Sequence, residues 1–228
     1  MGYKRAHRVV LITSGEAKPL WCSELINSEI LAMELLANLA TDHGVPTTTA
    51  AAFDRYLGTS FDFVVEDLRG AGATVDRDKV HAEFHSSLFD NFRTRLKEIP
   101  GTSQALKTLA DENRVVSIAS SGTLERVTLG ITTTGISHYF DNSVITTAED
   151  AERGKPFPDL FLITAERAGI DPKDCLVIED SAFGIEAARR AGMASIGLAF
   201  RTPKEKLLAA DLVVSSPEEI LIALGIST

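Results

Sequence analysis

Two adjacent carboxylates follow a short apolar run in the last third of the chain. The run Leu176–Ile178 leads directly into Glu179 and Asp180. In open parallel sheets, ligands bind beyond the carboxyl ends of the strands. Mg²⁺ prefers oxygen ligands and is commonly held by one or two carboxylates together with phosphate oxygens and water. Glu179 and Asp180 are therefore candidate Mg²⁺ ligands. The simpler alternative is that Asp180 or Ser181 only caps the next helix.

A second polar group follows another apolar run. Val115–Ala119 is succeeded by Ser120, Ser121 and Gly122. Side-chain hydroxyls and free backbone N–H groups at such a turn can bind an anion. The alternative, which is common for a Ser-Ser-Gly turn, is an ordinary helix start.

A third candidate is Lys155, which lies between Gly154 and Pro156. The proline restricts the backbone before it, so the lysine is held in a defined turn. A lysine ammonium is a compact point charge that suits a phosphoryl group. The alternative is a solvated loop lysine.

The second half of the chain alternates strand and helix patterns. Buried strands are predicted at five runs: Val115–Ala119, Ser143–Thr146, Leu176–Glu179, Ala194–Leu198 and Leu212–Val214. Helix starts are predicted at Thr202-Pro203 and Ser216-Pro217, and helix ends at Gly169 and Gly192. This alternation predicts a parallel sheet covered by helices on both faces, with all three candidate groups at one edge.

The first half reads differently. Val9–Ile12 is predicted to supply the first strand, whereas residues 24–95 show helical periodicity and no convincing strand. Within this block, Gly70-Ala71-Gly72 follows a helix and lacks a third glycine, so it indicates a helix end and not a dinucleotide site. We therefore predict an α/β protein with a Rossmann-like parallel-sheet core (residues 1–23 and 96–228) and an inserted all-helical cap domain (residues 24–95).

Composition excludes several classes of protein. The 228 residues are 44% hydrophobic and 24% charged, as in ordinary globular proteins, and the net charge of −9 disfavours nucleic acid as a partner. No apolar run is long enough to cross a bilayer, and Val9–Ile12 is too short for a signal-peptide core, so a cytoplasmic location is expected. Cys22 and Cys175 lie far apart and are expected to be free thiols. The sequence carries no signature of oligomeric state.

These motifs together resemble the haloacid dehalogenase superfamily, specifically its phosphatase and β-phosphoglucomutase-like branch with a helical cap. The resemblance covers nearly the whole chain. It rests on five segments: Cys22-Ser23-Glu24, Leu57-Gly58-Thr59-Ser60, Ser120, Gly154-Lys155-Pro156 and Glu179-Asp180-Ser181-Ala182-Phe183-Gly184-Ile185.

The resemblance implies a Mg²⁺-dependent phosphohydrolase or phosphomutase that acts on a small phosphorylated metabolite, such as a sugar phosphate. It implies that Ser120 donates a hydrogen bond to the phosphoryl group and that Ser121 and Gly122 offer backbone N–H groups. Lys155 would be the charge-balancing catalytic residue, and Glu179 with Asp180 would hold Mg²⁺. The cap would shape the substrate pocket and exclude water.

One family motif is missing. The family's first strand ends in Asp-x-Asp-Gly, where the first aspartate attacks phosphorus and the second transfers protons. Counting forward from the strand puts Thr13 and Gly15 in the aspartate positions, and counting back from Ser23-Glu24 puts Gly15 and Ala17 there. Glu16 has the wrong parity in both registers, so neither register supplies a carboxylate.

Other residues of this segment do not replace the aspartates. Ser14 and Cys22 have no positioned base nearby in sequence, and Lys18 would add positive charge to a pocket that should hold Mg²⁺. Two functions stay open: a hydrolase scaffold without an identifiable nucleophile, or a non-catalytic phospholigand-binding or regulatory protein. The segment itself could be naturally degenerate or altered by two compensating frameshifts. Hydrolytic dehalogenation would require the same missing aspartate.

Overall fold

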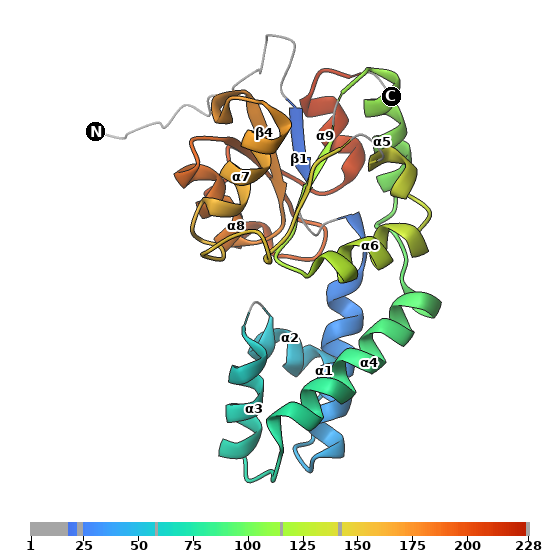
Figure 1. Ribbon diagram of the computed structural model, residues 1–228, viewed down its shortest axis with the longest axis vertical. Helices are drawn as coiled ribbons and strands as arrows, with labels where there is room; N and C mark the ends of the chain where they lie inside the picture. The colour runs from blue at the N-terminus through green and yellow to red at the C-terminus, as the bar shows by residue number, and fades with distance from the viewer. Residues whose placement is uncertain (1–17, 22–24, 58, 115, 141–142, 227–228) are drawn as a thin grey trace, which may run out of the picture. The chain divides into compact units, whose positions relative to one another are not determined.

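The computed structural model describes residues 18–21, 25–57, 59–114, 116–140 and 143–226 (Figure 1). The chain divides into two compact units. Of the described residues, the helical unit comprises those within Ile26–Lys97 together with Thr132–Thr134. The sheet unit comprises the described residues up to Leu25, those within Glu98–Ile131 and those from Gly135 onward. We describe each unit separately.

The described strands form one six-stranded parallel sheet with the order β3-β2-β1-β4-β5-β6. The strands are β1 (Lys18–Trp21), β2 (Ser117–Ala119), β3 (Ile145–Thr146), β4 (Cys175–Glu179), β5 (Ala194–Leu198) and β6 (Leu212–Val214). The five strands predicted in the second half of the chain are all present. The predicted Rossmann-like parallel sheet is confirmed.

The first described strand lies outside the runs that the sequence predicted. The strand between β2 and β4 is β1, Lys18–Trp21, and the predicted run Val9–Ile12 lies outside the described residues. β1 ends at Trp21 and helix α1 begins at Ser28, so few residues separate the strand from the helix. Pro19 of β1 pairs with Leu176 of β4. Proline has no N–H to donate to a ladder, so a proline in a central strand is unusual.

Helices cover both faces of the sheet (Figure 1). Helices α7 (Asp159–Ala168) and α8 (Ala182–Arg190) pack together on one face, and α5 (Thr102–Asp111) and α9 (Pro217–Ala223) pack together on the other. The core beneath α7 and α8 includes Phe161, Cys175 and Val177, each at most 1% exposed. Helix α6 (Leu124–Thr133) follows the turn after β2.

The helical unit contains α1 (Ser28–Asp42), α2 (Thr49–Tyr56), α3 (Phe61–Gly70) and α4 (Arg77–Arg95). Side chains of Thr48, Ser60 and Asp76 accept hydrogen bonds from backbone N–H groups of the first turn of α2, α3 and α4. Such caps satisfy donors that have no partner within the helix. The Gly70-Ala71-Gly72 segment ends α3, as predicted, with Gly72 at φ +94°.

Most of the predicted helix boundaries in the sheet unit are confirmed. Ser216 Oγ accepts a hydrogen bond from the Glu219 N–H (3.3 Å), and the Glu219 carboxylate accepts one from the Ser215 N–H (2.9 Å). Gly169 ends α7 in the left-handed conformation, and Gly192 follows α8 at φ +72°.

The helix start predicted at Thr202-Pro203 is wrong. Only a three-residue 3₁₀ turn, η4 (Lys204–Lys206), forms there, and no side chain caps it. The fully buried Leu207 follows the turn and lies against Gly197 of β5, where it approaches the position a Cβ would occupy to 3.0 Å. The 3₁₀ turn ends at Leu207, whose side chain packs against β5.

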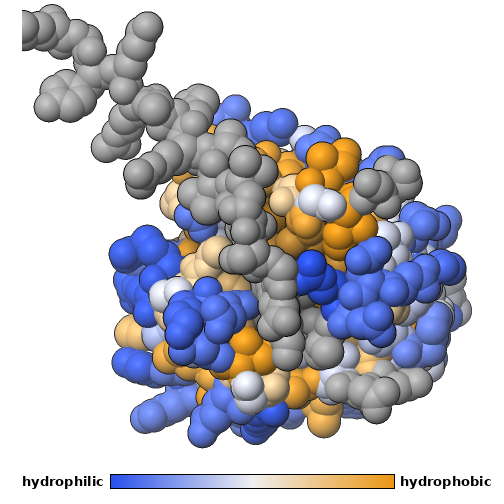
Figure 2. Space-filling view, turned by 90° about the horizontal axis from the view of Figure 1, so that it is seen from above, coloured by the Kyte–Doolittle hydropathy of each residue, from blue (hydrophilic) through white to orange (hydrophobic). Residues whose placement is uncertain are grey.

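The surface of the sheet unit is mixed in character. Figure 2 shows hydrophobic patches beside predominantly hydrophilic residues on one face. Leu208 and Ile222 are among the exposed large hydrophobic residues, at 72% and 63% exposure. Apolar atoms make up much of any protein surface. Within the described residues, no helix has both the length and the apolarity that spanning a membrane requires.

Candidate functional site

The sheet register brings two of the predicted groups to one edge. Trp21 of β1 pairs with Ile118 of β2 and with Ile178 of β4. Ser120 and Asp180 each lie two residues beyond these partners, so they stand at the same level on either side of β1. Neighbouring strands are about 4.8 Å apart, which places the two backbones roughly 10 Å from each other.

The hydroxyl turn after β2 is closely tied to its surroundings. Ser120 is 6% exposed, and its N–H donates to the Thr146 carbonyl of β3 (2.9 Å). Its Oγ accepts a hydrogen bond from the Gly122 N–H (3.1 Å). The hydroxyl and the N–H that were predicted to bind a phosphoryl group are thus bonded to each other, and Ser121 between them is exposed. An incoming anion could accept hydrogen bonds from both donors in place of this contact.

Two acidic residues of the loop after β3 fix the surroundings of this turn. The Glu149 carboxylate accepts a hydrogen bond from the Leu124 N–H (2.8 Å) in the first turn of α6. Asp150 accepts from the Thr147 N–H (2.8 Å) and pairs with Arg167 (2.7 Å). The hydrogen bond from Arg167, followed by that from the Thr147 N–H, lowers the pKa of Asp150. Sequence reasoning missed both acids, although a Thr-x-x-Asp segment after a strand is a turn signal.

Lys155 and Glu179 form a buried ion pair. The Lys155 Nζ lies 3.1 Å from the Glu179 Oε2, and their side chains are 8% and 3% exposed. The ammonium also lies over the ring of Phe161, 5.1 Å from its centre. Lys155 comes from the loop before α7, so the pair brings this loop to the carboxyl end of β4. A fixed positive charge therefore lies at the edge where Ser120 and Asp180 also lie.

The Glu179 carboxylate is fixed from its other side as well. Ser181 Oγ donates to Glu179 Oε1 (2.6 Å) and accepts from the Gly184 N–H (3.0 Å) at the start of α8. A Cβ on Gly184 would lie only 2.0 Å from the Glu179 Cδ. Only glycine leaves room for the carboxylate at this position. Sequence reasoning named Gly184 within a motif and gave it no role.

The strand end offers oxygen ligands for a hard cation. Ser181 is the N-cap of α8, so the simple capping alternative holds for this residue. Asp180, which precedes the cap, is partly exposed. Each carboxylate oxygen has two lone pairs, so Glu179 can accept its present hydrogen bonds and still contact a cation. Among the described residues, no group of three acidic, histidine or cysteine side chains gathers into a metal site.

The segment of the missing motif is described only in part. Thr13, Ser14, Gly15, Glu16, Ala17 and Cys22 lie outside the described residues. The backbone of Lys18 lies away from the edge of the sheet that carries Glu179 and Asp180. Lys18 begins β1 in register with Cys175, which is the end of the sheet opposite to Glu179. The first aspartate in the whole sequence is Asp42.

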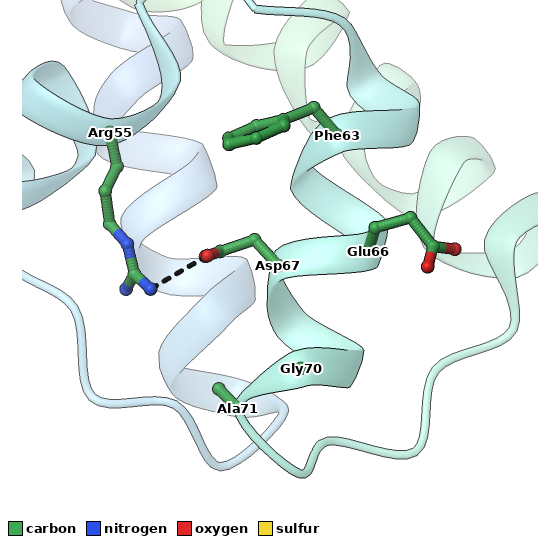
Figure 3. Close-up of a pocket in the computed structure, with 6 residues that line it drawn as sticks. All are labelled: Arg55, Phe63, Glu66, Asp67, Gly70 and Ala71. Carbon is green, nitrogen blue, oxygen red and sulfur yellow. Dashed lines mark hydrogen bonds and ion pairs between the residues drawn. The ribbon is translucent and has the colours of Figure 1, made fainter.

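A hollow in the helical unit is a separate feature (Figure 3). Its lining contains none of the predicted site residues and consists of Arg55, Phe63, Glu66, Asp67, Gly70 and Ala71. Arg55 of α2 and Asp67 of α3 point toward each other and pair at 2.9 Å. The Tyr56 hydroxyl donates to the second Asp67 oxygen (2.8 Å). These contacts join α2 to α3, so the polar residues of the hollow stabilise the packing of the two helices.

Comparison with known proteins gives a consistent family. A model for haloacid dehalogenase-like hydrolases matches residues 24–198, which begins after the segment of the missing motif. The validoxylamine A 7'-phosphate phosphatase of Streptomyces hygroscopicus subsp. limoneus is 28% identical over 198 residues, or 86% of this chain and 91% of the relative. The β-phosphoglucomutase of Bacillus subtilis is 32% identical over 131 residues, or 55% of this chain and 53% of the relative.

The fold is also that of a solved structure. The haloacid dehalogenase-like protein ATU0790 of Agrobacterium tumefaciens superimposes with a TM-score of 0.80 at 25% identity. The alignment covers 92% of this chain and 98% of that protein.

Proposed function

Because this chain belongs to the haloacid dehalogenase-like hydrolase family, we propose that it binds the phosphoryl group of a small phosphorylated metabolite, of the sugar-phosphate class, at the carboxyl edge of its sheet. The names of its phosphatase and phosphomutase relatives support this substrate class. The observation that carries the proposal is the buried Lys155–Glu179 pair at the end of β4. It fixes a positive charge at the edge that also carries the hydroxyl turn.

Each residue of the site has a proposed part. Lys155 Nζ and Ser120 Oγ would donate to phosphoryl oxygens, and the N–H groups of Ser121 and Gly122 would add further donors. A hydrogen bond with a charged partner contributes roughly 1.5 to 3 kcal/mol. Donors held before the ligand arrives lose little conformational entropy on binding.

We propose that Mg²⁺ binds at Glu179 and Asp180. Two neighbouring carboxylates at a strand end, one of them partly exposed, match the oxygen ligands that this ion prefers. The ion would neutralise charge on the phosphoryl group.

We further propose that the chain does not form an aspartyl-phosphate and that its main activity is binding. No aspartate precedes Asp42, so the first strand carries no nucleophile of the family type. A hydrolase therefore stands as the second candidate. Robust Mg²⁺-dependent hydrolysis of an aryl phosphate, with a phosphoenzyme mapped between Thr13 and Cys22, would favour it over the binding protein.

Thermal stability in the presence of ligand tests the binding site. Inorganic phosphate or vanadate should raise the melting temperature of the wild-type chain, because a ligand of the folded state adds RT ln(1 + [L]/Kd) to the free energy of unfolding. The shift should shrink in Lys155→Ala and persist in Lys206→Ala, which alters a lysine of the exposed η4 turn. Each variant is compared with its own ligand-free melting temperature.

Equal shifts in the wild type and in Lys155→Ala would contradict the proposed site. No shift in any variant would contradict phosphate binding altogether.

A further inference from the structure

Two histidines on α4 lie one helical turn apart and face each other. His81 and His85 have the spacing i, i+4, which places their side chains on the same face of the helix. Their ring centres are 4.5 Å apart, with 38° between the ring planes. Both side chains are partly exposed. Two ionisable rings in such close contact, with access to solvent, form an unusual cluster outside the sheet site.

Neighbouring rings hold the two imidazoles in place. The ring of Phe61 meets His81 edge-on at 5.0 Å, and the ring of Phe89 stacks on His85 at 5.9 Å. Phe84 lies 5.4 Å from Phe61 and completes the row of rings. Packing on both sides restricts rotation of the imidazoles. Binding of a ligand to both rings therefore costs little conformational entropy.

We infer that His81 and His85 form a bidentate site for a transition-metal ion such as Ni²⁺, Cu²⁺ or Zn²⁺. Imidazole suits these ions, whereas Mg²⁺ prefers oxygen. Two imidazole nitrogens, each about 2.0 to 2.1 Å from one ion, put the ring centres roughly 4.5 to 5.2 Å apart for right-angled to tetrahedral coordination. The observed 4.5 Å falls in this range.

Histidines at positions i and i+4 of a helix are a known physical arrangement for binding one metal ion with two ligands. Glu83, between them in sequence, approaches His43 instead (3.9 Å). Among the described residues, no third acidic, histidine or cysteine side chain joins the two histidines, so water would fill the remaining positions of the ion. The inference concerns the helical unit alone and is independent of the phosphoryl site.

Calorimetric titration of the full, untagged chain with Ni²⁺ tests this site. We expect one ion to bind per chain, with an affinity at least about tenfold higher than that of His81→Ala or His85→Ala, which corresponds to about 1.4 kcal/mol. His43→Ala and His138→Ala are matched controls and should leave the affinity unchanged. Circular dichroism of each variant establishes that α4 is still folded.

A second measurement locates the ion directly. Ni²⁺ is paramagnetic and should broaden the imidazole NMR signals of His81 and His85 at lower concentrations than those of His43 and His138. The inference is overturned if the two alanine variants bind Ni²⁺ as tightly as the wild type. It is equally overturned if broadening begins at the other histidines, or if millimolar Ni²⁺ does not bind.

Discussion

Replacement of Lys155 by methionine should cost far more stability than loss of an ordinary surface lysine. The Lys155 and Glu179 side chains are 8% and 3% exposed and 3.1 Å apart, so the ammonium offsets a charge that water cannot reach. Methionine keeps most of the side-chain volume and removes the charge. Breaking a buried pair from one side typically costs about 3 to 5 kcal/mol, because the remaining charge is left without compensation. Total stabilities are only about 5 to 15 kcal/mol.

The measurement is urea unfolding followed by tryptophan fluorescence. Trp21 is the single tryptophan of the chain and belongs to β1, so it reports on the sheet unit even if the two units unfold separately. The matched control is Lys173→Met. Lys173 pairs with Asp171 at 2.9 Å, but the two side chains are 72% and 51% exposed, and such pairs contribute at most about 1 kcal/mol.

A double variant separates charge from packing. Lys155→Met combined with Glu179→Leu removes both charges and should recover much of the lost stability, since apolar replacements of a buried pair are often neutral. The reasoning is refuted if Lys155→Met costs no more than Lys173→Met. It is also refuted if adding Glu179→Leu to Lys155→Met lowers the free energy of unfolding further, as it would if the two side chains contributed independently.

Three further outcomes are expected. Gly184→Ala should destabilise the chain by about 1 to 3 kcal/mol in urea unfolding, because the new Cβ would overlap Glu179, whereas Gly70→Ala, with open space around it, should change little. Hydrogen bonds from Arg189 and then Arg190 lower the pKa of Glu186 from 4.5 to about 2. The stabilising contribution of Glu186 should be present above pH 4.5 and be lost as the pH falls toward 2. Glu186→Gln should therefore make the melting temperature depend less on pH over that interval. Burial and then the hydrogen bond to Asp67 raise the pKa of Tyr56 to about 12. The stabilising contribution of Tyr56 should be complete below pH 10 and be lost as the pH rises through 12, and Tyr56→Phe should remove the step near pH 12 from a tyrosinate absorbance titration.

Much of the sheet could be predicted from local patterns. The run at β4 is buried along its whole length, and β5 is buried at four of its five residues. Short apolar runs rich in branched residues are typical of such doubly covered strands. Glycines with positive φ and a capping box marked the ends of several helices. These signals need no knowledge of distant contacts.

β1 could not be predicted in this way. Its residues Lys18, Pro19, Leu20 and Trp21 include no β-branched residue, and the proline cannot donate a hydrogen bond to the ladder. Its position depends on two partners elsewhere in the chain, β2 and β4. Pairing across such separations overrides local propensity.

In the candidate site, too, local patterns predicted the residues but not the tertiary contacts between them. Residue types pointed to Ser120, Lys155 and the Glu179-Asp180 pair, because polar groups after apolar runs are visible in sequence. The contacts of Glu149 with the first turn of α6, and of Glu179 with Gly184, are tertiary and leave no such trace.

The order of the strands also has a consequence for how the chain folds during synthesis. β1 is the first of the described strands to leave the ribosome, yet its partners lie far downstream: Leu20 pairs with Ser117 and with Val177, 97 and 157 positions later (117 − 20 and 177 − 20). At about 5 to 20 residues per second, the central strand waits many seconds for its second neighbour. Helices α1 to α4 are complete within this interval and can pack through short-range contacts. β1, in the middle of the sheet, is thus the earliest made of the described strands, and one of its edges stays unpaired until β4 has been synthesised.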